Sequence, residues 1–325
     1  MMRRLSLFLL ALALAFLLLP HVFPPLAGYC RANVARPLTA LIGGVSARVP
    51  FPVAGVLFIA LVAAILSLSI LACWFRLAAR CLALFLSGVF CAYAMMWGCL
   101  YARPSAHAIE LTPAALNHLC HRLIDEADDA LARVRTKYTF PDLLEAGCRL
   151  MSAQTQLPLV PAKAASRPNL LSALGLAGFY SPLTGEAVVN PGDCPDTLPF
   201  TICHELAHQA GIAREDEANF CAFLACERGN LPRFRYAACF TTLLYTMRSL
   251  RAVDQAAWER AISHMSPALS ARFNRANRPA DIPVHGMTRI QRAVTDAFLR
   301  LSGDSYGIES YERVLPLIAA HWGIR

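Results

Sequence analysis

One stretch decides how the second part of the chain folds and what it can bind: Thr201-Ile202-Cys203-His204-Glu205-Leu206-Ala207-His208. It contains the pattern H-E-x-x-H, in which two histidines four residues apart lie on one face of a helix, so both imidazoles can reach one metal ion. Glu205 lies about 100° further round the helix. There a carboxylate can deprotonate a metal-bound water instead of binding the metal. The pattern predicts a zinc site of the hydrolase type.

A third protein ligand is expected shortly after this stretch. Gly211 predicts the end of the first helix, and a second helix should begin near Arg214. Among the acids in its first turn, Glu215 and Glu217 are about 200° apart and cannot both face the metal. We expect Glu215 to be the ligand, with Glu217 as the alternative. Asn219 lies one turn after Glu215, where its side chain can hydrogen-bond to a metal ligand and hold that ligand in orientation.

Two histidines and one carboxylate leave a fourth position open for water, which is the catalytic pattern. Zinc suits this ligand set best, so we expect one Zn²⁺ ion. Glu205 would take a proton from the water and pass it to the leaving amine. Hydrogen-bond donors for the developing oxyanion are also expected. The candidates, each of which taken singly is more readily explained as structural, are Tyr180, His285, Tyr306 and Tyr311.

The composition is that of a membrane protein, with 56% apolar and 16% charged residues. The first 103 residues contain eight arginines and no acidic residue, so the net charge of +8 belongs to this part of the chain. Arginines that flank apolar segments are typical of membrane proteins and argue against a nucleic-acid surface. We therefore expect the lipid bilayer as a partner and no nucleic acid.

Three segments are long and apolar enough to cross a bilayer: about 5–23, 53–75 and 82–101. The first is longer than a cleavable signal sequence, so we expect it to remain as an anchor. We interpret residues 24–50 as a loop with an interfacial helix. The membrane region then covers residues 1–104, and a second domain covers 105–325.

The basic residues that flank these segments are divided equally between the two sides. Arg3, Arg4, Arg76 and Arg80 lie on one side, against Arg31, Arg36, Arg48 and Arg103 on the other. The first helix usually decides the orientation, and its amino-terminal flank is the more basic one. We expect the N-terminus on the inner, cytoplasmic side of the bacterial cytoplasmic membrane and the second domain on its outer side.

The second domain should be mostly helical with a small sheet, so the predicted fold class is mainly α. Thr112-Pro113 is a typical helix start, and helices are expected to about Tyr138 and again from Asp142 to Gln154. Glu186-Ala187-Val188-Val189-Asn190 is predicted to be a strand. Such a strand beside a metal helix can pair with an extended substrate, although a purely structural strand is equally consistent with the pattern.

The spacing of these residues resembles a known pattern. His204-Glu205-Leu206-Ala207-His208, followed by Glu215-x-x-Ala218-Asn219, is similar to the gluzincin zinc peptidases, in which the third ligand opens an E-x-x-A-[DN] helix. The chain also resembles the bacterial membrane family called domain of unknown function 3810. That resemblance rests on Pro50-Phe51-Pro52, the stretches 178–186, 199–211 and 214–220, and Ser310-Tyr311. It implies three spans and a zincin-like domain but brings no known substrate.

The sequence therefore favours a membrane-anchored zinc metallopeptidase that acts on a peptide or protein substrate near the membrane. A zinc-binding membrane sensor or scaffold without turnover is one alternative, and an amidase acting on cell-wall peptides is another. Glu205 favours an enzyme, because a binding module has no need of a general base at that position.

Overall fold

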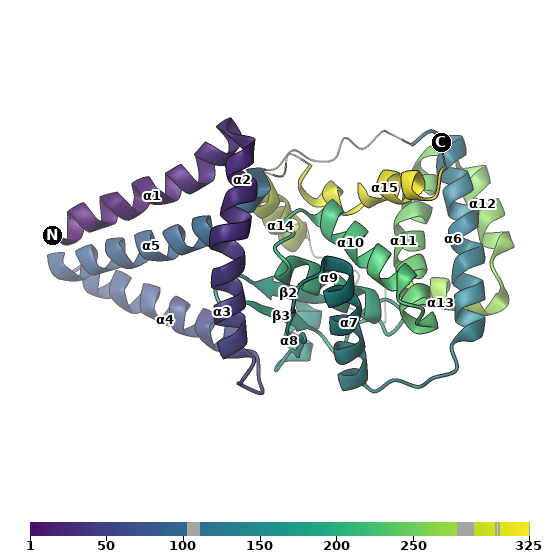
Figure 1. Ribbon diagram of the computed structural model, residues 1–325, viewed down its shortest axis with the longest axis horizontal. Coiled ribbons are helices and arrows are strands. Elements are labelled where there is room, and N and C mark those ends of the chain that lie inside the picture. The colour runs from purple at the N-terminus through teal and green to yellow at the C-terminus, as the bar shows by residue number, and fades with distance from the viewer. Residues whose placement is uncertain (103–110, 278–288, 303, 305, 325) are drawn as a thin grey trace. The chain divides into compact units, whose positions relative to one another are not determined.

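Figure 1 shows a computed structural model of the protein, which describes all residues except 103–110, 278–288, 303, 305 and 325. The described chain is mainly helical with one small mixed sheet, which confirms the predicted fold class. It divides into two compact units. The N-terminal unit comprises Met1–Pro104 and Tyr180–Glu186, and the C-terminal unit comprises Ser105–Phe179 and Ala187–Arg325.

Three helices of the N-terminal unit are long and apolar enough to cross a membrane: α1 (Met2–Val22), α4 (Val53–Ala72) and α5 (Arg76–Met96). The first two follow the predicted spans closely. The third begins at Arg76 rather than at residue 82. Arginine is a good helix former, and its long side chain can reach polar surroundings from the first turn of a span.

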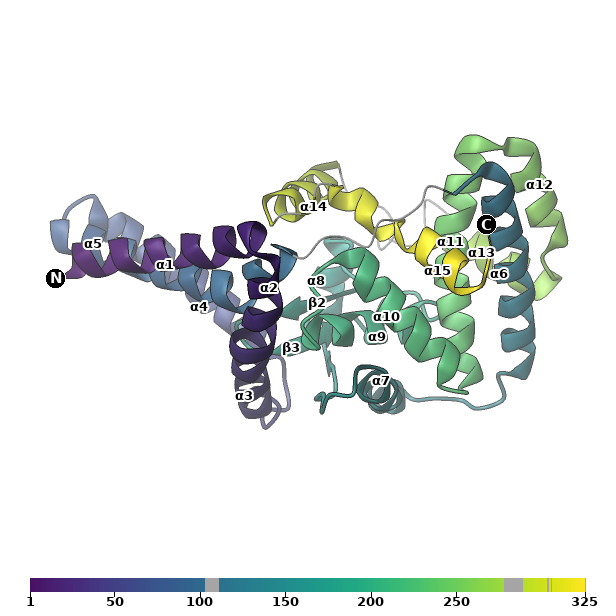
Figure 2. The same cartoon turned by 45° about the horizontal axis from the view of Figure 1, so that its top comes forward.

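The sequence predicted a loop with an interfacial helix over 24–50, but residues 24–46 are helical throughout, so the loop was wrong for most of this stretch. They form α2 (Pro24–Cys30), a π-helix (Arg31–Ala35) and α3 (Arg36–Ser46) in direct succession. Proline is tolerated in the first turn of a helix, where its missing N–H has no partner to lose, so Pro24 can begin α2. Figures 1 and 2 show these segments running across the ends of the three long helices.

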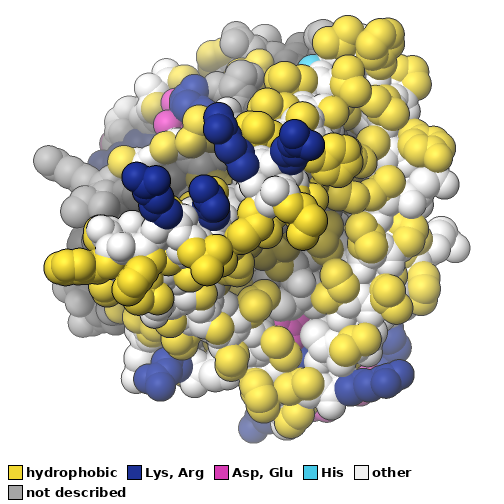
Figure 3. Space-filling model, turned by 90° about the vertical axis from the view of Figure 1, so that its left-hand side faces the viewer, with side chains coloured by type: hydrophobic (Ala, Val, Ile, Leu, Met, Phe, Trp, Pro, Cys, Tyr) yellow, Lys and Arg dark blue, Asp and Glu magenta, His cyan; other side chains and the backbone are white. Residues whose placement is uncertain are grey.

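The other end of the N-terminal unit is basic. Arg3 and Arg4 lie in the first turn of α1, and Arg76 and Arg80 lie in the first turns of α5. All four side chains are exposed. Figure 3 views the molecule from this end and shows basic side chains grouped among hydrophobic ones.

In the C-terminal unit, α6 (Pro113–Arg133) packs along α11 (Pro232–Val253). Helix α6 begins where the sequence predicted, because Thr112 Oγ1 accepts a hydrogen bond from Ala115 N at 3.1 Å. The core between the helices is apolar, and its largest fully buried side chains include Phe223, Phe234, Tyr236 and Phe240.

Two shorter helices follow α11. Both α12 (Gln255–His264) and α13 (Pro267–Ala276) pack against α6. The sequence analysis did not predict α13. Its start is nevertheless marked by a Ser-Pro pair, and Ser266 Oγ accepts a hydrogen bond from Leu269 N at 3.2 Å. This is the same cap-and-proline pattern that begins α6.

Helix α7 (Phe140–Thr155) lies against α9 (Leu198–Gln209), which contains the H-E-x-x-H pattern. Gly147 permits this close approach. A Cβ atom at Gly147 would come within 2.5 Å of the Ile202 side chain, so any larger residue would push α9 aside. The reversal after α9 leads to α10 (Glu215–Arg228), which packs against both α9 and α11.

The sheet has the strand order β1 (Lys163–Ala164), β3 (Glu186–Val189), β2 (Gly178–Ser181), and a short helix α8 (Pro168–Ala173) separates β1 from β2 in the chain. The central strand is therefore β3, which pairs with β1 in parallel on one side and with β2 on the other. The prediction of Glu186–Asn190 as an edge strand for substrate was wrong, because neighbouring strands occupy both sides. Among the described strands, β2 is at an edge of the sheet, and Gly178 at its start lies against Glu205 of α9.

The C-terminal segment consists of α14 (Arg289–Leu301), a 3-10 turn (Gly307–Tyr311) and α15 (Val314–His321). The 3-10 turn ends at Tyr311, and α15 begins at Val314. Both the turn and α15 pack against α10.

Candidate metal centre

The two histidines of α9 point to a common position. Their Nε2 atoms lie 3.1 Å apart, and both side chains are buried. The rings meet at 84°, with centroids 4.6 Å apart. One helical turn thus brings two metal-binding nitrogens together, as the spacing predicted.

The third ligand reaches this position through a sharp reversal after α9. Gly211 adopts φ +79°, Gly211 N donates to His208 O at 2.9 Å, and Ile212 N donates to Ala207 O at 3.1 Å. These two bonds form the Schellman motif that ends many helices. A residue with a Cβ atom is disfavoured in this left-handed conformation, so the reversal depends on glycine.

The reversal places Glu215 at the first position of α10, facing the two histidines. Glu215 Oε2 lies 3.2 Å from His204 Nε2 and 3.5 Å from His208 Nε2. Among the described residues, these three form the group that could hold a metal ion, and all three are buried. The structure therefore brings Glu215, not the alternative Glu217, to the histidines.

A backbone carbonyl fixes the tautomer of His208. The Nδ1–H group of His208 donates to Ile212 O at 2.7 Å, which leaves Nε2 to face Glu215 and His204. Metal-binding histidines usually donate their other ring N–H in this way, and the bond orients the ring. The sequence analysis missed Ile212, because a backbone group carries no side-chain pattern. The sequence feature that indicated the turn carrying this carbonyl was Gly211.

The three ligand atoms match the spacing that zinc requires. Ligand atoms held tetrahedrally about 2.0–2.1 Å from zinc lie about 3.3–3.4 Å from one another. The observed separations are 3.1, 3.2 and 3.5 Å. Two imidazole nitrogens and a carboxylate oxygen also suit zinc chemically. The residues present therefore fit one zinc ion.

The charges of these residues also fit a bound cation. Burial disfavours charge on His208 and Glu215, but their mutual attraction outweighs it: the pKa of His208 rises to about 9, and the pKa of Glu215 falls far below its ordinary value. The buried carboxylate thus requires a cation between itself and the imidazoles. A proton supplies that charge in metal-free protein, and a bound metal would displace it.

Glu205 lies beside this group with its carboxyl buried. Burial raises its pKa, partly offset by His204 and His208. Its Oε2 atom has no hydrogen-bond partner among the described residues. Its Oε1 atom faces Gly178 of β2, where a Cβ atom would come within 2.8 Å. Glu205 is therefore positioned by packing against a glycine, with one oxygen left free of protein donors.

Asn219 and Tyr311 connect the C-terminal segment to the site. Asn219 Nδ2 donates to Tyr311 O at 3.3 Å, so its partner is this backbone carbonyl. The ring of Tyr311 stacks on the His204 imidazole at 28°, with centroids 6.3 Å apart. Of the three oxyanion candidates that the structure describes, Tyr311 is the one whose ring packs on a metal-site histidine.

The other three candidates have different surroundings. Tyr180 belongs to the N-terminal unit, where its ring packs on Trp97 with centroids 5.1 Å apart. The guanidinium of Arg313 stacks 3.5 Å above the ring of Tyr306, which gives Tyr306 a structural role. His285 lies outside the described residues.

A buried ionic cluster ties α10 to the C-terminal segment, and the sequence analysis missed it. Arg214, just before α10, lies 3.5 Å from Asp216 and 4.0 Å from Asp304, measured from guanidinium nitrogen to carboxylate oxygen. All three side chains are buried. Asp304 Oδ1 also accepts a hydrogen bond from Tyr306 N at 3.0 Å. The cluster fixes the segment that carries Tyr311.

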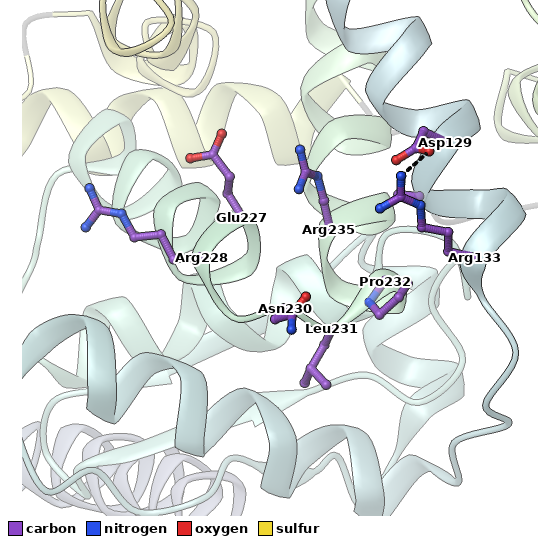
Figure 4. A pocket seen from close by; sticks show the side chains of 9 residues that line it. Asp129, Arg133, Glu227, Arg228, Asn230, Leu231, Pro232 and Arg235 are labelled. Atoms are coloured by element: carbon purple, nitrogen blue, oxygen red, sulfur yellow. Dashed lines mark ion pairs between the residues drawn. The ribbon is translucent and has the colours of Figure 1, made fainter.

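A separate pocket is shown in Figure 4, at the ends of α6, α10 and α11. Asp129 and Arg133, one turn apart on α6 at its side, pair at 2.7 Å, and Arg235, which also lines it, pairs with Glu126. His204, His208 and Glu215 are not among the residues that line it. The pocket is distinct from the metal centre.

Comparison with known proteins places the chain in a family. The chain belongs to the family described as "Protein of unknown function (DUF3810)", which matches residues 32–319 and so includes the whole metal centre. No curated protein and no solved structure matches the chain. The family description gives no activity, so function must be argued from the site.

Gly211 is not a metal ligand, but replacing it with alanine should lower both the stability of the protein and its affinity for zinc. The left-handed conformation costs a residue with a Cβ atom about 1–2 kcal/mol. Because Gly211 positions the Ile212 carbonyl, zinc affinity should also fall, by about 10–100-fold. Denaturant unfolding and chelator competition measure the two effects. Gly211→Asn is the matched control and should lose less of both, since asparagine tolerates this conformation.

Metal content tests the ligand assignment. Purified protein should bind one zinc ion per chain, and Glu215→Ala should weaken binding by at least about 100-fold, because it removes a ligand and not only a supporting residue. Glu217→Ala is the matched control. Glu217 lies two residues further along the same helix, and this variant should keep its full zinc content. Elemental analysis after dialysis measures both. Loss of zinc from Glu217→Ala with retention by Glu215→Ala would reverse the assignment.

Proposed function

We propose that the protein is a membrane-anchored zinc metallopeptidase that hydrolyses peptide bonds. The observation that carries the proposal is the buried group His204, His208 and Glu215 with the Glu205 carboxyl beside it. Three protein ligands leave a tetrahedral zinc with one open position, which is the arrangement of catalytic and not of structural sites.

The roles of the residues follow from this geometry. Zinc, when bound, acidifies a water molecule and polarises the substrate carbonyl. Glu205, whose Oε2 atom has no hydrogen-bond partner among the described residues, would accept a proton from the attacking water and deliver it to the leaving amine. Tyr311 is the oxyanion donor we propose, since its ring lies over His204.

The edge strand β2 supports a peptide substrate. Gly178 at its start abuts Glu205, and β2 is an edge strand of the sheet among the described residues. An extended peptide can add to such an edge through main-chain hydrogen bonds. The three long apolar helices keep the protein at a membrane, and we propose that the substrate is a peptide or protein segment at the membrane surface.

We further propose that the C-terminal unit lies outside the cytoplasmic membrane. The end with Arg3, Arg4, Arg76 and Arg80 would then face the cytoplasm. The basic residues are divided equally between the two sides, and the amino-terminal flank of the first helix decides for this orientation. This places Cys73, between α4 and α5, on the cytoplasmic side.

Glu205→Gln should abolish hydrolysis while leaving zinc bound. The amide has nearly the same shape but cannot accept the proton, and losing a general base costs about 10²–10⁴-fold in rate. Cleavage of a peptide library by full-length protein in detergent, with zinc measured in the same samples, provides the test. If wild type and Glu205→Gln both hold zinc and neither cleaves any peptide, the result would instead favour a sensor or scaffold.

Labelling of intact cells with an impermeant maleimide tests the orientation. Cys73 is exposed in the structure and should stay unlabelled until the cells are opened. A cysteine introduced at exposed Lys137, in a Cys73→Ser background, should be labelled in intact cells. The reverse pattern would place the metal centre in the cytoplasm.

A further inference from the structure

Helix α14 of the C-terminal unit exposes an apolar side. The helix is strongly amphipathic, and four of its apolar residues are exposed: Ala293, Ala297, Phe298 and Leu301. Residues 293, 297 and 301 follow one another at intervals of one turn, and Phe298 lies next to this row, so the four share one side of the helix. Phe298 is 48% exposed and Leu301 is 89% exposed. Among the described side chains of α14, Leu299 is the apolar one that is buried.

The polar side of α14 is the side that packs. The helix lies against the 3-10 turn Gly307–Tyr311. Arg300 Nε donates to Asp296 Oδ2 at 2.8 Å, and Arg300 Nη2 donates to Tyr306 O at 3.5 Å. A Cβ atom at Gly307 would clash with the Asp296 carboxylate, so this carboxylate faces the turn at close range. Polar contacts therefore hold α14 to its own unit, and the apolar side is left outside.

This arrangement is the reverse of the one expected for a surface helix in water. A surface helix of a globular protein buries its apolar stripe against the core and shows its polar side to solvent. Exposed apolar patches on a folded protein usually mark a surface that contacts a membrane or another protein. The outward side of α14 is therefore a docking surface.

Charge and tethering identify a lipid bilayer as the partner of this surface. The sequence of α14 contains three arginines and one aspartate, and the side chain of Arg300 is exposed. Basic residues beside an apolar helix face are typical of helices that lie in the headgroup region of a membrane. There the arginine heads stay at the polar surface while apolar side chains enter the acyl boundary. Three helices long and apolar enough to cross a membrane keep the chain at a bilayer, so this partner is always within reach.

We propose that α14 is an interfacial helix that docks on the bilayer surface through Ala293, Ala297, Phe298 and Leu301. The helix axis lies in the plane of the membrane, and Arg300 lies at the level of the lipid phosphates. This inference goes beyond the proposed function and does not depend on it. Because α14 packs against the turn that ends at Tyr311, the docked helix lies next to a segment of the metal centre.

Fluorescence quenching tests the docking in full-length protein reconstituted into vesicles of phosphatidylcholine and phosphatidylglycerol. Phe298→Trp places a reporter on the apolar side, and the signal of the four native tryptophans is subtracted with wild type. The reporter should lose most of its fluorescence to lipids brominated near the headgroup end of their chains. It should be protected from iodide supplied on both sides of the membrane. Ala256→Trp, at an exposed position of α12, is the matched control and should show the opposite pattern.

A second change tests the apolar contact itself. Leu301→Glu, added to Phe298→Trp, should shift the docking equilibrium towards water by at least about 10-fold, because a charge replaces a leucine that docking buries. Lipid quenching should then fall and iodide quenching should rise, whereas Leu301→Met should change neither. Leu301 is exposed, so both changes should leave the fold intact.

Three results would overturn the proposal. The first is a Phe298→Trp reporter that iodide quenches and brominated lipid does not. The second is a reporter shielded from both quenchers, which would place the apolar side against protein. The third is lipid quenching that Leu301→Glu leaves unchanged. None of these results depends on whether the protein cleaves a peptide, so the proposed function is tested separately.

Discussion

The C-terminal unit depends on one electrostatic constraint: two imidazole nitrogens and a carboxylate oxygen converge within 3.5 Å in a buried site. An uncompensated carboxylate is costly in such surroundings, so the group is stable only with a cation at its centre. A proton between Glu215 and His208 meets that need poorly, because it serves two of the three ligands. A divalent metal would satisfy all three, and its binding would then be coupled to the folding of this region.

Much of the surrounding structure serves to bring the three ligands together. Helix α9 supplies the histidines, and the glycine-dependent reversal at Gly211 both returns the chain to Glu215 and presents a carbonyl to His208. Close packing at Gly147 keeps α9 against α7. The buried cluster around Arg214 then holds the segment that carries Tyr311 against the site.

The sequence was sufficient for the parts of the site that depend on local geometry. Helical periodicity placed His204 and His208 on one face and selected Glu215 over Glu217, and the structure brings these three residues together. The strand at Glu186 was also found, but its place in the sheet was not, because strand order depends on pairing between segments remote in the chain. Backbone ligands such as Ile212 O carry no side-chain pattern at all.

The two units also differ in how they are stabilised. The C-terminal unit buries large aromatic side chains around α11, whereas α4 exposes apolar side chains along most of its length, as a helix surrounded by lipid does. Gly178 and Gly185 mark two places where backbone and neighbour approach too closely for a side chain.

The most direct test of the account is X-ray absorption spectroscopy at the zinc edge on full-length protein loaded with one equivalent of zinc. The account predicts nitrogen and oxygen neighbours alone, at about 2.0–2.1 Å, with the multiple scattering typical of two imidazoles. A sulfur shell at about 2.3 Å would contradict it, because the metal would then be bound by cysteine and not by His204, His208 and Glu215.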